Sequence, residues 1–286
     1  MDSFFKLQAR GTSTATEFRA GLTTFLAMAY IIIVNPSILS AAGIPETAAV
    51  TATCLGAAVM TIAMGVFSNR PLACASGMGI NSIVAFTLCI GMGVGWQTAM
   101  AVIFVEGIAI LLLVLCGLRE AIMDAIPVPL RHGISIGLGL FIAMIGLKDG
   151  GVIVANTDTL VSLGSIVDAA GALNFTFVIG VISIILTVIL YSMNVKGALL
   201  WSIIISAIIG IPLGVTPLPD GIIAPLDFTT FAAPFQVSEP SGVMGIIEVI
   251  TTPTLLLMAF SLMMSDFFDT MGTAMAVAKQ GDFLTE

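Results

Sequence analysis

Residues 251–279 read TTPTLLLMAFSLMMSDFFDTMGTAMAVAK. A helix that crosses the hydrocarbon core of a bilayer needs about 20 predominantly apolar residues. This stretch exceeds that length, and its charged residues are Asp266, Asp269 and, at its end, Lys279. It therefore predicts a membrane-spanning helix that carries two acids within its apolar length.

Composition extends this interpretation to the whole chain of 286 residues. Hydrophobic residues make up 58% of the chain, charged residues make up 9%, and the mean hydropathy is +1.14. A soluble domain carries about 25% charged residues, so the lipid bilayer must be the solvent for much of this chain. The formal net charge of −8 argues against a nucleic-acid partner, because nucleic-acid binding needs a basic surface.

Apolar stretches divide the chain into eight candidate spans. Segment 117–128 is expected to form a short interfacial helix, and Ser241–Ile250 a short amphipathic turn. Loops rich in Gly, Pro, Asp, Thr and Ser are expected at 148–172 and 215–250. The predicted fold class is an all-α polytopic membrane protein. Its spans cover residues 18–40, 47–67, 71–91, 96–116, 129–147, 173–192, 196–214 and 251–279.

The basic residues predict how these spans are oriented. Cytoplasmic loops of membrane proteins carry an excess of Lys and Arg. With a cytoplasmic N-terminus, eight of the nine basic residues lie on the cytoplasmic side, among them Lys196, and Lys148 alone lies outside. We therefore expect a multi-pass protein of the cell membrane whose N-terminus is cytoplasmic.

The third apolar segment is irregular and holds the first candidate site. It opens with Pro71 and contains Gly77, Met78 and Gly79, and such interrupted segments are the best sequence sign of a transporter's binding site. We expect residues 71–79 to be extended and a half-helix to start near Gly79. Backbone N–H groups at that start, with the Asn81 side chain in the first turn, would bind a substrate. The alternative is that the glycines serve close helix packing.

Three acids within spans form the second candidate site, namely Glu106, Asp266 and Asp269. An ionisable side chain at membrane depth is costly and commonly functional. Asp266 and Asp269 share one helical face, and their closeness in apolar surroundings predicts a protonation switch near neutral pH. The alternatives are a cap or interhelical hydrogen bond for the pair, and a hydrogen bond to a neighbouring helix for Glu106.

Tyr30 and the Asn35–Pro36 pair form the polar end of the first span. We expect Asn35–Pro36 to break the helix there, because proline disturbs a helix interior. Tyr30 is a candidate for stacking on a flat ring. A purely structural kink is an equally good interpretation of these residues.

Enzymatic classes find no support in the sequence. The chain has no HExxH motif, no paired catalytic Ser and His, and no GxxxxGK[ST] nucleotide-binding loop. Its four cysteines show no metal-ligand spacing, so no cofactor is expected. The cysteines, which we interpret as small buried hydrophobic residues, are Cys54, Cys74, Cys89 and Cys116.

Four segments taken together resemble one family. They are RAGLTTFLAMAYIIIVNP at 19–36, GMGIN at 77–81, GLGLFIAMIGL at 137–147 and DFFDTMGT at 266–273. They resemble the first, third, fifth and eighth spans of the AzgA-like purine permeases, which carry adenine or guanine and hypoxanthine and belong to the nucleobase:cation symporter-2 group.

The resemblance implies a fold of two inverted repeats of seven spans, divided into a core and a gate domain. Residues 1–128 would be core spans one to four, 129–250 the gate spans, and 251–286 the eighth span. The resemblance also leaves a homodimer through the gate domain open. A tenth span normally completes the site, and the sequence ends at Glu286 before reaching it, so we expect an N-terminal portion of such a permease.

For function, the resemblance implies secondary transport of a purine nucleobase, coupled to a proton. Asp269 carries over as the eighth-span carboxylate that contacts the base, and Asn81 as a polar third-span position. The flat ring of a purine suits an aromatic side chain such as Tyr30 or Phe268. The rival is an anion transporter of the same architecture, and the acids Asp266 and Asp269 count against it.

Overall fold

The structure is a computed structural model that describes residues 2–5, 7, 11–117, 128–167, 171–195, 197–216 and 225–280. These residues form two compact units, and three helices contribute to both. Unit 1 comprises residues 1–36, 50–76 and 143–226, and unit 2 comprises residues 37–49, 77–142 and 227–286. The expected interfacial helix at 117–128 and Lys196 lie outside the described residues, apart from the ends of that segment at Gly117 and Val128.

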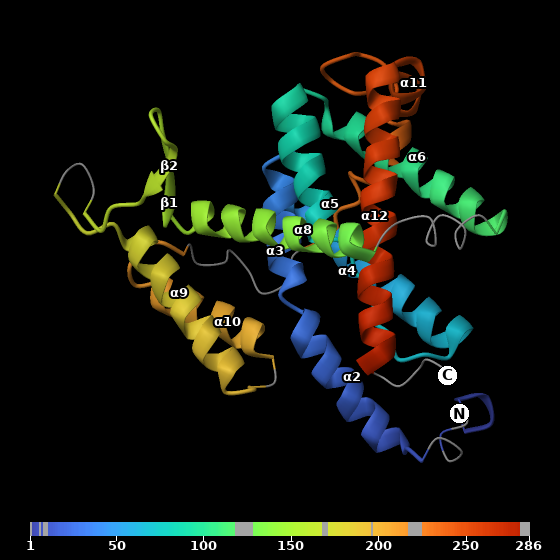
Figure 1. The fold of residues 1–286 in the computed structure, drawn as a ribbon, viewed down its shortest axis with the longest axis horizontal. Coiled ribbons are helices and arrows are strands. Elements are labelled where there is room, and N and C mark those ends of the chain that lie inside the picture. Colours follow the sequence, from blue (N-terminus) through green and yellow to red (C-terminus); the bar gives the residue numbers. More distant parts are fainter. Residues whose placement is uncertain are drawn as a thin grey trace. The chain divides into compact units, whose positions relative to one another are not determined.

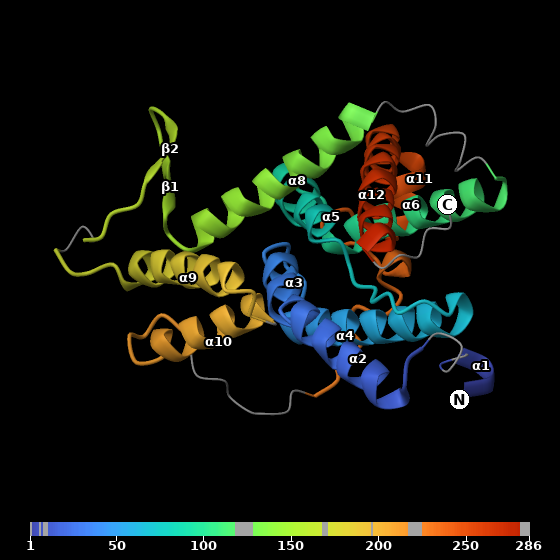
Figure 2. The same cartoon turned by 60° about the horizontal axis from the view of Figure 1, so that its bottom comes forward.

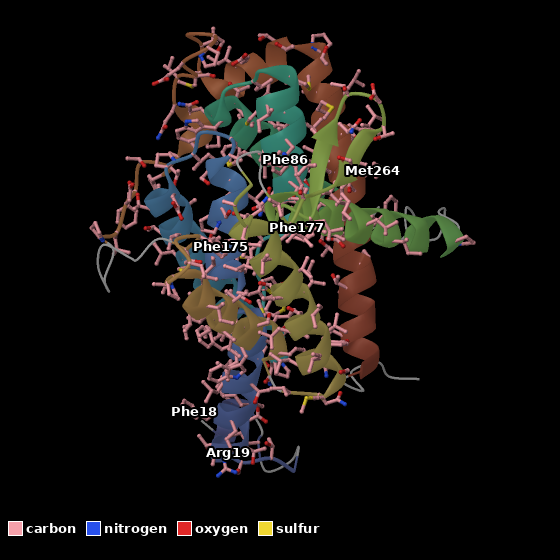
Figure 3. All side chains as sticks on the ribbon, turned by 90° about the vertical axis from the view of Figure 1, so that its left-hand side faces the viewer. Phe18, Arg19, Phe86, Phe175, Phe177 and Met264 are labelled. Carbon is pink, nitrogen blue, oxygen red and sulfur yellow. The ribbon has the colours of Figure 1, made fainter. Side chains whose placement is uncertain are left out.

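Unit 1 contains α1 (Asp2–Phe5), α2 (Thr14–Met28) and a helical hairpin of α9 (Phe175–Ser192) and α10 (Ala198–Gly210). The two hairpin helices lie side by side (Figures 1 and 2). A hydrogen bond of 2.9 Å joins the hydroxyls of Thr187 and Ser202 between them. At the start of α9, Phe175 is exposed and Phe177 is buried (Figure 3).

The predicted loop at 148–172 is partly wrong, because it contains two strands. Strands β1 (Ile153–Asn156) and β2 (Leu160–Leu163) pair in antiparallel register, with Ile153 opposite Leu163. The reason is a local turn: Oδ1 of Asn156 accepts hydrogen bonds from the N–H groups of Asp158 and Thr159, at 2.8 and 3.1 Å. Asparagine favours such turns, and the branched residues on either side favour strands.

The first span is interrupted, but not where the sequence predicted. Helix α2 ends at Met28 and α3 (Ile31–Ser40) begins two residues after Ala29, with Pro36 inside α3. The turn between them is tightened, since Ile33 N–H bonds to Tyr30 O at 3.1 Å. The expected break at Asn35–Pro36 is therefore wrong: the interruption lies upstream of Pro36, and α3 continues through the proline.

Unit 2 is built around an apolar core shared by four helical segments. These are α5 with η3 (Met78–Ser82 and Ile83–Gly91), α6 (Trp96–Leu115), α11 (Gly245–Thr251) and α12 (Pro253–Gln280). Figure 1 shows α6 and α12 in the same region, and they pack directly on each other. The fully or almost fully buried members of this core are Val84, Leu88, Ala99, Ala101, Val102, Val249, Leu255 and Leu262. Short helix η4 (Ala233–Phe235) also contacts α6.

Three helical segments remain, namely α4 (Glu46–Ala63), the wider π-helical turn η2 (Met64–Ser68) that continues it, and α8 (Val128–Asp149). Within the described residues, five helices are long and apolar enough to cross a membrane. They cover Thr14–Ser40, Glu46–Ser68, Trp96–Leu115, Phe175–Ser192 and Pro253–Ala274, and Met78–Gly91 and Ala198–Gly210 are shorter apolar helices. The chain is thus a mostly helical multi-pass membrane protein, and the count of eight spans stays a prediction.

The third apolar segment follows its prediction closely. Residues 69–77 are not helical, and α5 begins at Met78, one residue before the position expected. Gly77 caps this helix in an extended conformation with φ −73° and ψ 114°. From Ile83 to Gly91 the helix widens into π-helical turns, which are rare and often found at functional sites.

Candidate functional site

The structure brings the start of the third-span helix against the acids of the eighth-span helix, within unit 2. A β-carbon placed on Gly77 would lie 3.7 Å from Oδ2 of Asp269. Because glycine has no side chain, the backbone at the beginning of α5 faces this carboxylate directly. Two candidate sites that the sequence treated separately therefore meet at one place.

Asp266 and Asp269 are both half-buried on α12, and their carboxyl groups are close enough to interact electrostatically. Oγ1 of Thr270 donates a hydrogen bond of 3.3 Å to Oδ1 of Asp266. The hydroxyl of Thr273 instead bonds to the backbone oxygen of Asp269 at 2.8 Å. Of the two carboxylates, that of Asp269 faces the Gly77 backbone.

Glu106 extends this group from a second helix. Its side chain is 4% exposed on α6, and it interacts electrostatically with Asp266 of α12. The three acids thus form a series in which Asp266 interacts with Glu106 on one side and with Asp269 on the other. Chains of acids within membrane spans are typical of proton relays.

The remaining candidate residues of the third span form the first turn of α5. Met78 is half-buried and Gly79 is buried, and the Asn81 N–H bonds to the Gly77 oxygen at 3.1 Å. Asn81 is half-buried in the first turn, as predicted from its position. Fully buried Ser82 donates its hydroxyl to the Met78 oxygen at 2.8 Å.

The two candidate aromatic residues are placed differently. Phe268 lies on α12 between the two aspartates, is 7% exposed, and packs edge-on against Phe267 with ring centroids 5.6 Å apart. Tyr30 lies in unit 1, half-buried at the turn between α2 and α3. Phe268 therefore shares a unit with the acids, and Tyr30 does not.

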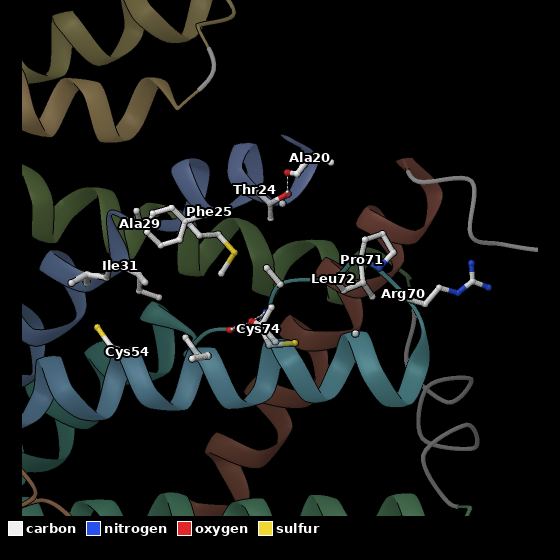
Figure 4. A pocket seen from close by; sticks show the side chains of 18 of the residues that line it. Ala20, Thr24, Phe25, Ala29, Ile31, Cys54, Arg70, Pro71, Leu72 and Cys74 are labelled. Atoms are coloured by element: carbon white, nitrogen blue, oxygen red, sulfur yellow. Dashed lines mark hydrogen bonds between the residues drawn. The ribbon is translucent and has the colours of Figure 1, made fainter. Parts of the chain in front are cut away.

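Unit 1 contains a cavity of about 510 Å³ between α2, α4 and the extended segment that follows η2 (Figure 4). Phe25, Ala29, Cys54 and Cys74 line it, and none of its described lining residues belongs to the predicted site. Its walls are mostly apolar side chains, with Glu17 and Arg70 also among them. All of its described lining residues belong to unit 1.

Two polar contacts in the structure were not foreseen from the sequence. In unit 1, the Thr61 hydroxyl bonds to the backbone of Cys74. In unit 2, Oε2 of Glu248 accepts hydrogen bonds from Thr98 at 2.6 Å and from Ser241 at 2.7 Å. A threonine inside an apolar helix ordinarily bonds its own helix, so its residue type gives no signal for such a partner.

No group of three or more His, Cys, Asp or Glu side chains suited to a metal ion occurs in the part of the chain that the structure describes.

Comparison with known proteins finds a match to the permease family over residues 15–283. The chain is 38% identical over 284 residues to a putative permease of Methanocaldococcus jannaschii, and the aligned region covers 99% of this chain and 62% of the relative. It is 37% identical over 292 residues to an adenine permease of Escherichia coli (strain K12), with coverage of 100% and 61%. It is 36% identical over 298 residues to a guanine/hypoxanthine permease of Bacillus subtilis (strain 168), with coverage of 100% and 64%. The chain thus spans about three fifths of the length of these relatives.

Proposed function

The chain belongs to the permease family, and from this premise we propose that it works in the transport of purine nucleobases across the cell membrane, driven by proton symport. Membership places it among membrane transporters and not among enzymes. The relatives named above support the substrate class, since they are called adenine and guanine/hypoxanthine permeases.

One observation carries the proposal to particular residues, namely the approach of Gly77 to Asp269. A purine is flat and presents alternating hydrogen-bond donors and acceptors along its edge. A carboxylate accepts from an N–H group, and an amide both donates and accepts. Asp269, the backbone of residues 77–79 and Asn81 together supply this set. Phe268, which lies on α12 between the two aspartates, adds the aromatic surface for the ring.

In this proposal the three acids are the groups that bind the coupling proton. Glu106, Asp266 and Asp269 form this series in unit 2. A proton that binds to Asp269 neutralises the site, and the loaded core then moves across the membrane without moving a net charge at this residue. Binding of the base and binding of the proton are thereby linked at one carboxylate.

Uptake of radiolabelled hypoxanthine into cells that express the complete gene product tests this function. We expect saturable uptake that unlabelled adenine, guanine or hypoxanthine reduces, while uracil and sulfate do not. Cells with the empty vector serve as the control. Absence of saturable uptake of any purine would contradict the proposal, and competition by sulfate would favour an anion carrier.

A further inference from the structure

The extended segment between η2 and α5 is fixed in its middle by one side chain. Oγ1 of Thr61, on α4, accepts a hydrogen bond from the N–H of Cys74 at 2.9 Å. The same oxygen donates its proton to the backbone oxygen of Cys74 at 3.1 Å. Thr61 thus pairs with both polar groups of one residue, as a neighbouring strand would.

This pairing matters because the segment follows a predicted membrane span. Irregular backbone at membrane depth is tolerated only where its polar groups are satisfied or line a cavity. Thr61 is half-buried and Cys74 is half-buried, and both line the 510 Å³ cavity of unit 1. The segment therefore has α4 on one side and open space on the other.

Hydrogen bonds elsewhere in the segment are few. Within the described part of the chain, residues 71–76 make the bond from Leu72 N–H to the Arg70 oxygen, at 2.9 Å, and the two bonds to Thr61. The first of these is internal to the segment. The pair at Thr61 is accordingly the hydrogen-bonded link between this segment and a described helix.

We propose that Thr61 is a positioning residue for purine binding, because it anchors the backbone at Cys74 and the chain runs from there in three residues to Gly77. This inference rests on the proposed function, in which the Gly77 backbone and Asp269 bind the base. Thr61 does not touch the base. It limits how far the backbone at Cys74, three residues before Gly77, can move.

The test uses the complete gene product in nanodiscs and three threonine variants. Thr61→Val keeps the shape and removes both hydrogen bonds, and Thr61→Ser keeps the hydroxyl. Thr87→Val is the matched control, because Thr87 lies exposed on η3, in the predicted span 71–91 that also contains Cys74. Equilibrium binding of labelled hypoxanthine is measured for each. We expect Thr61→Val to lower the affinity about tenfold, which corresponds to about 1.4 kcal/mol, and Thr61→Ser and Thr87→Val to bind as the parent does.

Cys74 itself provides a second measurement that needs no substrate. In a background where Cys54, Cys89 and Cys116 are alanine, the rate of Cys74 alkylation by N-ethylmaleimide reports how firmly the segment is held. We expect the rate to rise in Thr61→Val and to return to the parent value in Thr61→Ser. An unchanged alkylation rate in Thr61→Val overturns the anchor. A raised rate with unchanged hypoxanthine affinity overturns the positioning role.

Two further outcomes are also decisive. If the parent binds no purine, the proposed function fails and the positioning role with it, and the alkylation rates separate that case from loss of the anchor. If Thr61→Val does not run as a single species on size exclusion, Cys74→Pro replaces it. Proline removes the N–H that Thr61 accepts and is tolerated in extended backbone. Parent-like hypoxanthine affinity in a well-folded Cys74→Pro protein overturns the proposal.

Discussion

The backbone of Gly77 faces the carboxylate of Asp269, with the position of a missing β-carbon 3.7 Å from Oδ2. The two residues are far apart in the sequence and belong to the third and the eighth predicted spans. Helix α5 begins at Met78, so Gly77 lies just before its first turn, in an extended conformation. The interruption of the third predicted span thus lies against a residue of the eighth, Asp269.

Substitutions at position 77 test whether the closeness of the Gly77 backbone to the Asp269 carboxylate matters for purine binding. The φ of −73° suits any residue, and a β-carbon at 3.7 Å from Oδ2 is in ordinary contact, so Gly77→Ala is expected to insert normally and to lose little affinity. Gly77→Val would occupy the space between backbone and carboxylate, and we expect purine binding to weaken by about 1–3 kcal/mol. Binding of labelled hypoxanthine to the purified complete gene product measures both.

A control for this prediction is Gly56→Val, because Gly56 lies on α4 and, outside that helix's own backbone, no described residue comes within 4 Å of a β-carbon placed on it. It repeats the glycine-to-valine change in a helix, away from Asp269. Equal loss of affinity in Gly56→Val and Gly77→Val would mean that the effect is a general one on folding. Parent-like affinity in Gly77→Val would mean that residue 77 does not contribute to purine binding and serves helix packing alone.

The hydrogen bonds of Asp227 predict how its carboxylate contributes to stability as the pH changes. The N–H of Thr229 donates to Oδ1 at 2.9 Å and the Thr47 hydroxyl donates to Oδ2 at 2.8 Å. These bonds, with that of Thr229 as the larger cause, hold the pKa of Asp227 below its ordinary value of 3.8. A depressed pKa means that the carboxylate stabilises the fold above the unfolded value, and that this contribution is lost as the pH falls through the folded value.

Thr47→Val removes one of the donors that lower the pKa of Asp227 and leaves those of Thr229, so the pKa should rise part of the way towards 3.8. A carbon-13 NMR titration of the aspartate carboxyl groups in the parent and in Thr47→Val would measure the difference, with Asp227→Asn used to assign the signal. Identical midpoints in both proteins would show that the Thr47 bond does not form in the membrane.

The start of α5 could be predicted because glycines and a proline cluster in an otherwise apolar stretch, and few other arrangements tolerate that composition at membrane depth. The membrane class followed from composition in the same way. By contrast, the hairpin after α8 depends on the side chain of Asn156 turning back on its own backbone. Such a turn is one of several that the residues 148–172 allow, so the sequence indicated a loop.

Contacts between distant segments were the least predictable part. Nothing in an apolar helix distinguishes Thr61, which bonds to Cys74, from a threonine that bonds its own helix. The link between Glu106 and Asp266 likewise depends on how α6 packs on α12. The sequence indicated each acid as a candidate because burying an ionisable side chain is costly. That the two acids interact could not be predicted without knowing how the two helices pack.

Two hydrogen bonds bear on the membrane topology. Thr47 at the start of α4 bonds to Asp227, and Thr98 at the start of α6 bonds to Glu248. The alternation of eight spans puts all four residues on the external side, so these bonds agree with an even number of spans between the bonded segments. The basic residues add the orientation.

A thiol at position 158 tests that orientation. In a background without Cys54, Cys74, Cys89 and Cys116, Asp158→Cys should react with a membrane-impermeant maleimide in intact cells, because the hairpin is expected outside. Lys196→Cys in the same background is the matched control and should react only after the cells are opened. The reverse pattern would place the N-terminus outside.

Asp269 is the residue on which purine binding and proton coupling meet in the proposed function. Asp269→Asn keeps the size of the side chain and removes its ability to take up and release a proton. We expect proteoliposomes with this variant to lose accumulation of labelled hypoxanthine driven by an imposed inward proton gradient. Binding should persist, weakened by about 1–3 kcal/mol, because the amide still forms part of the hydrogen bonding to the base.

The control for this loss is Asp158→Asn, which removes a carboxylate from the hairpin turn and leaves α12 untouched. Asp266→Asn distinguishes the two acids of the helix, since Asp266 is bonded to Thr270 whereas Asp269 faces the Gly77 backbone. If Asp269→Asn accumulates hypoxanthine in response to the gradient as the parent does, while Asp266→Asn does not, then Asp266 is the coupling acid and Asp269 serves binding alone. Loss of gradient response in Asp269→Asn, with Asp158→Asn at the parent level, is the result that the approach of Gly77 to Asp269 leads us to expect.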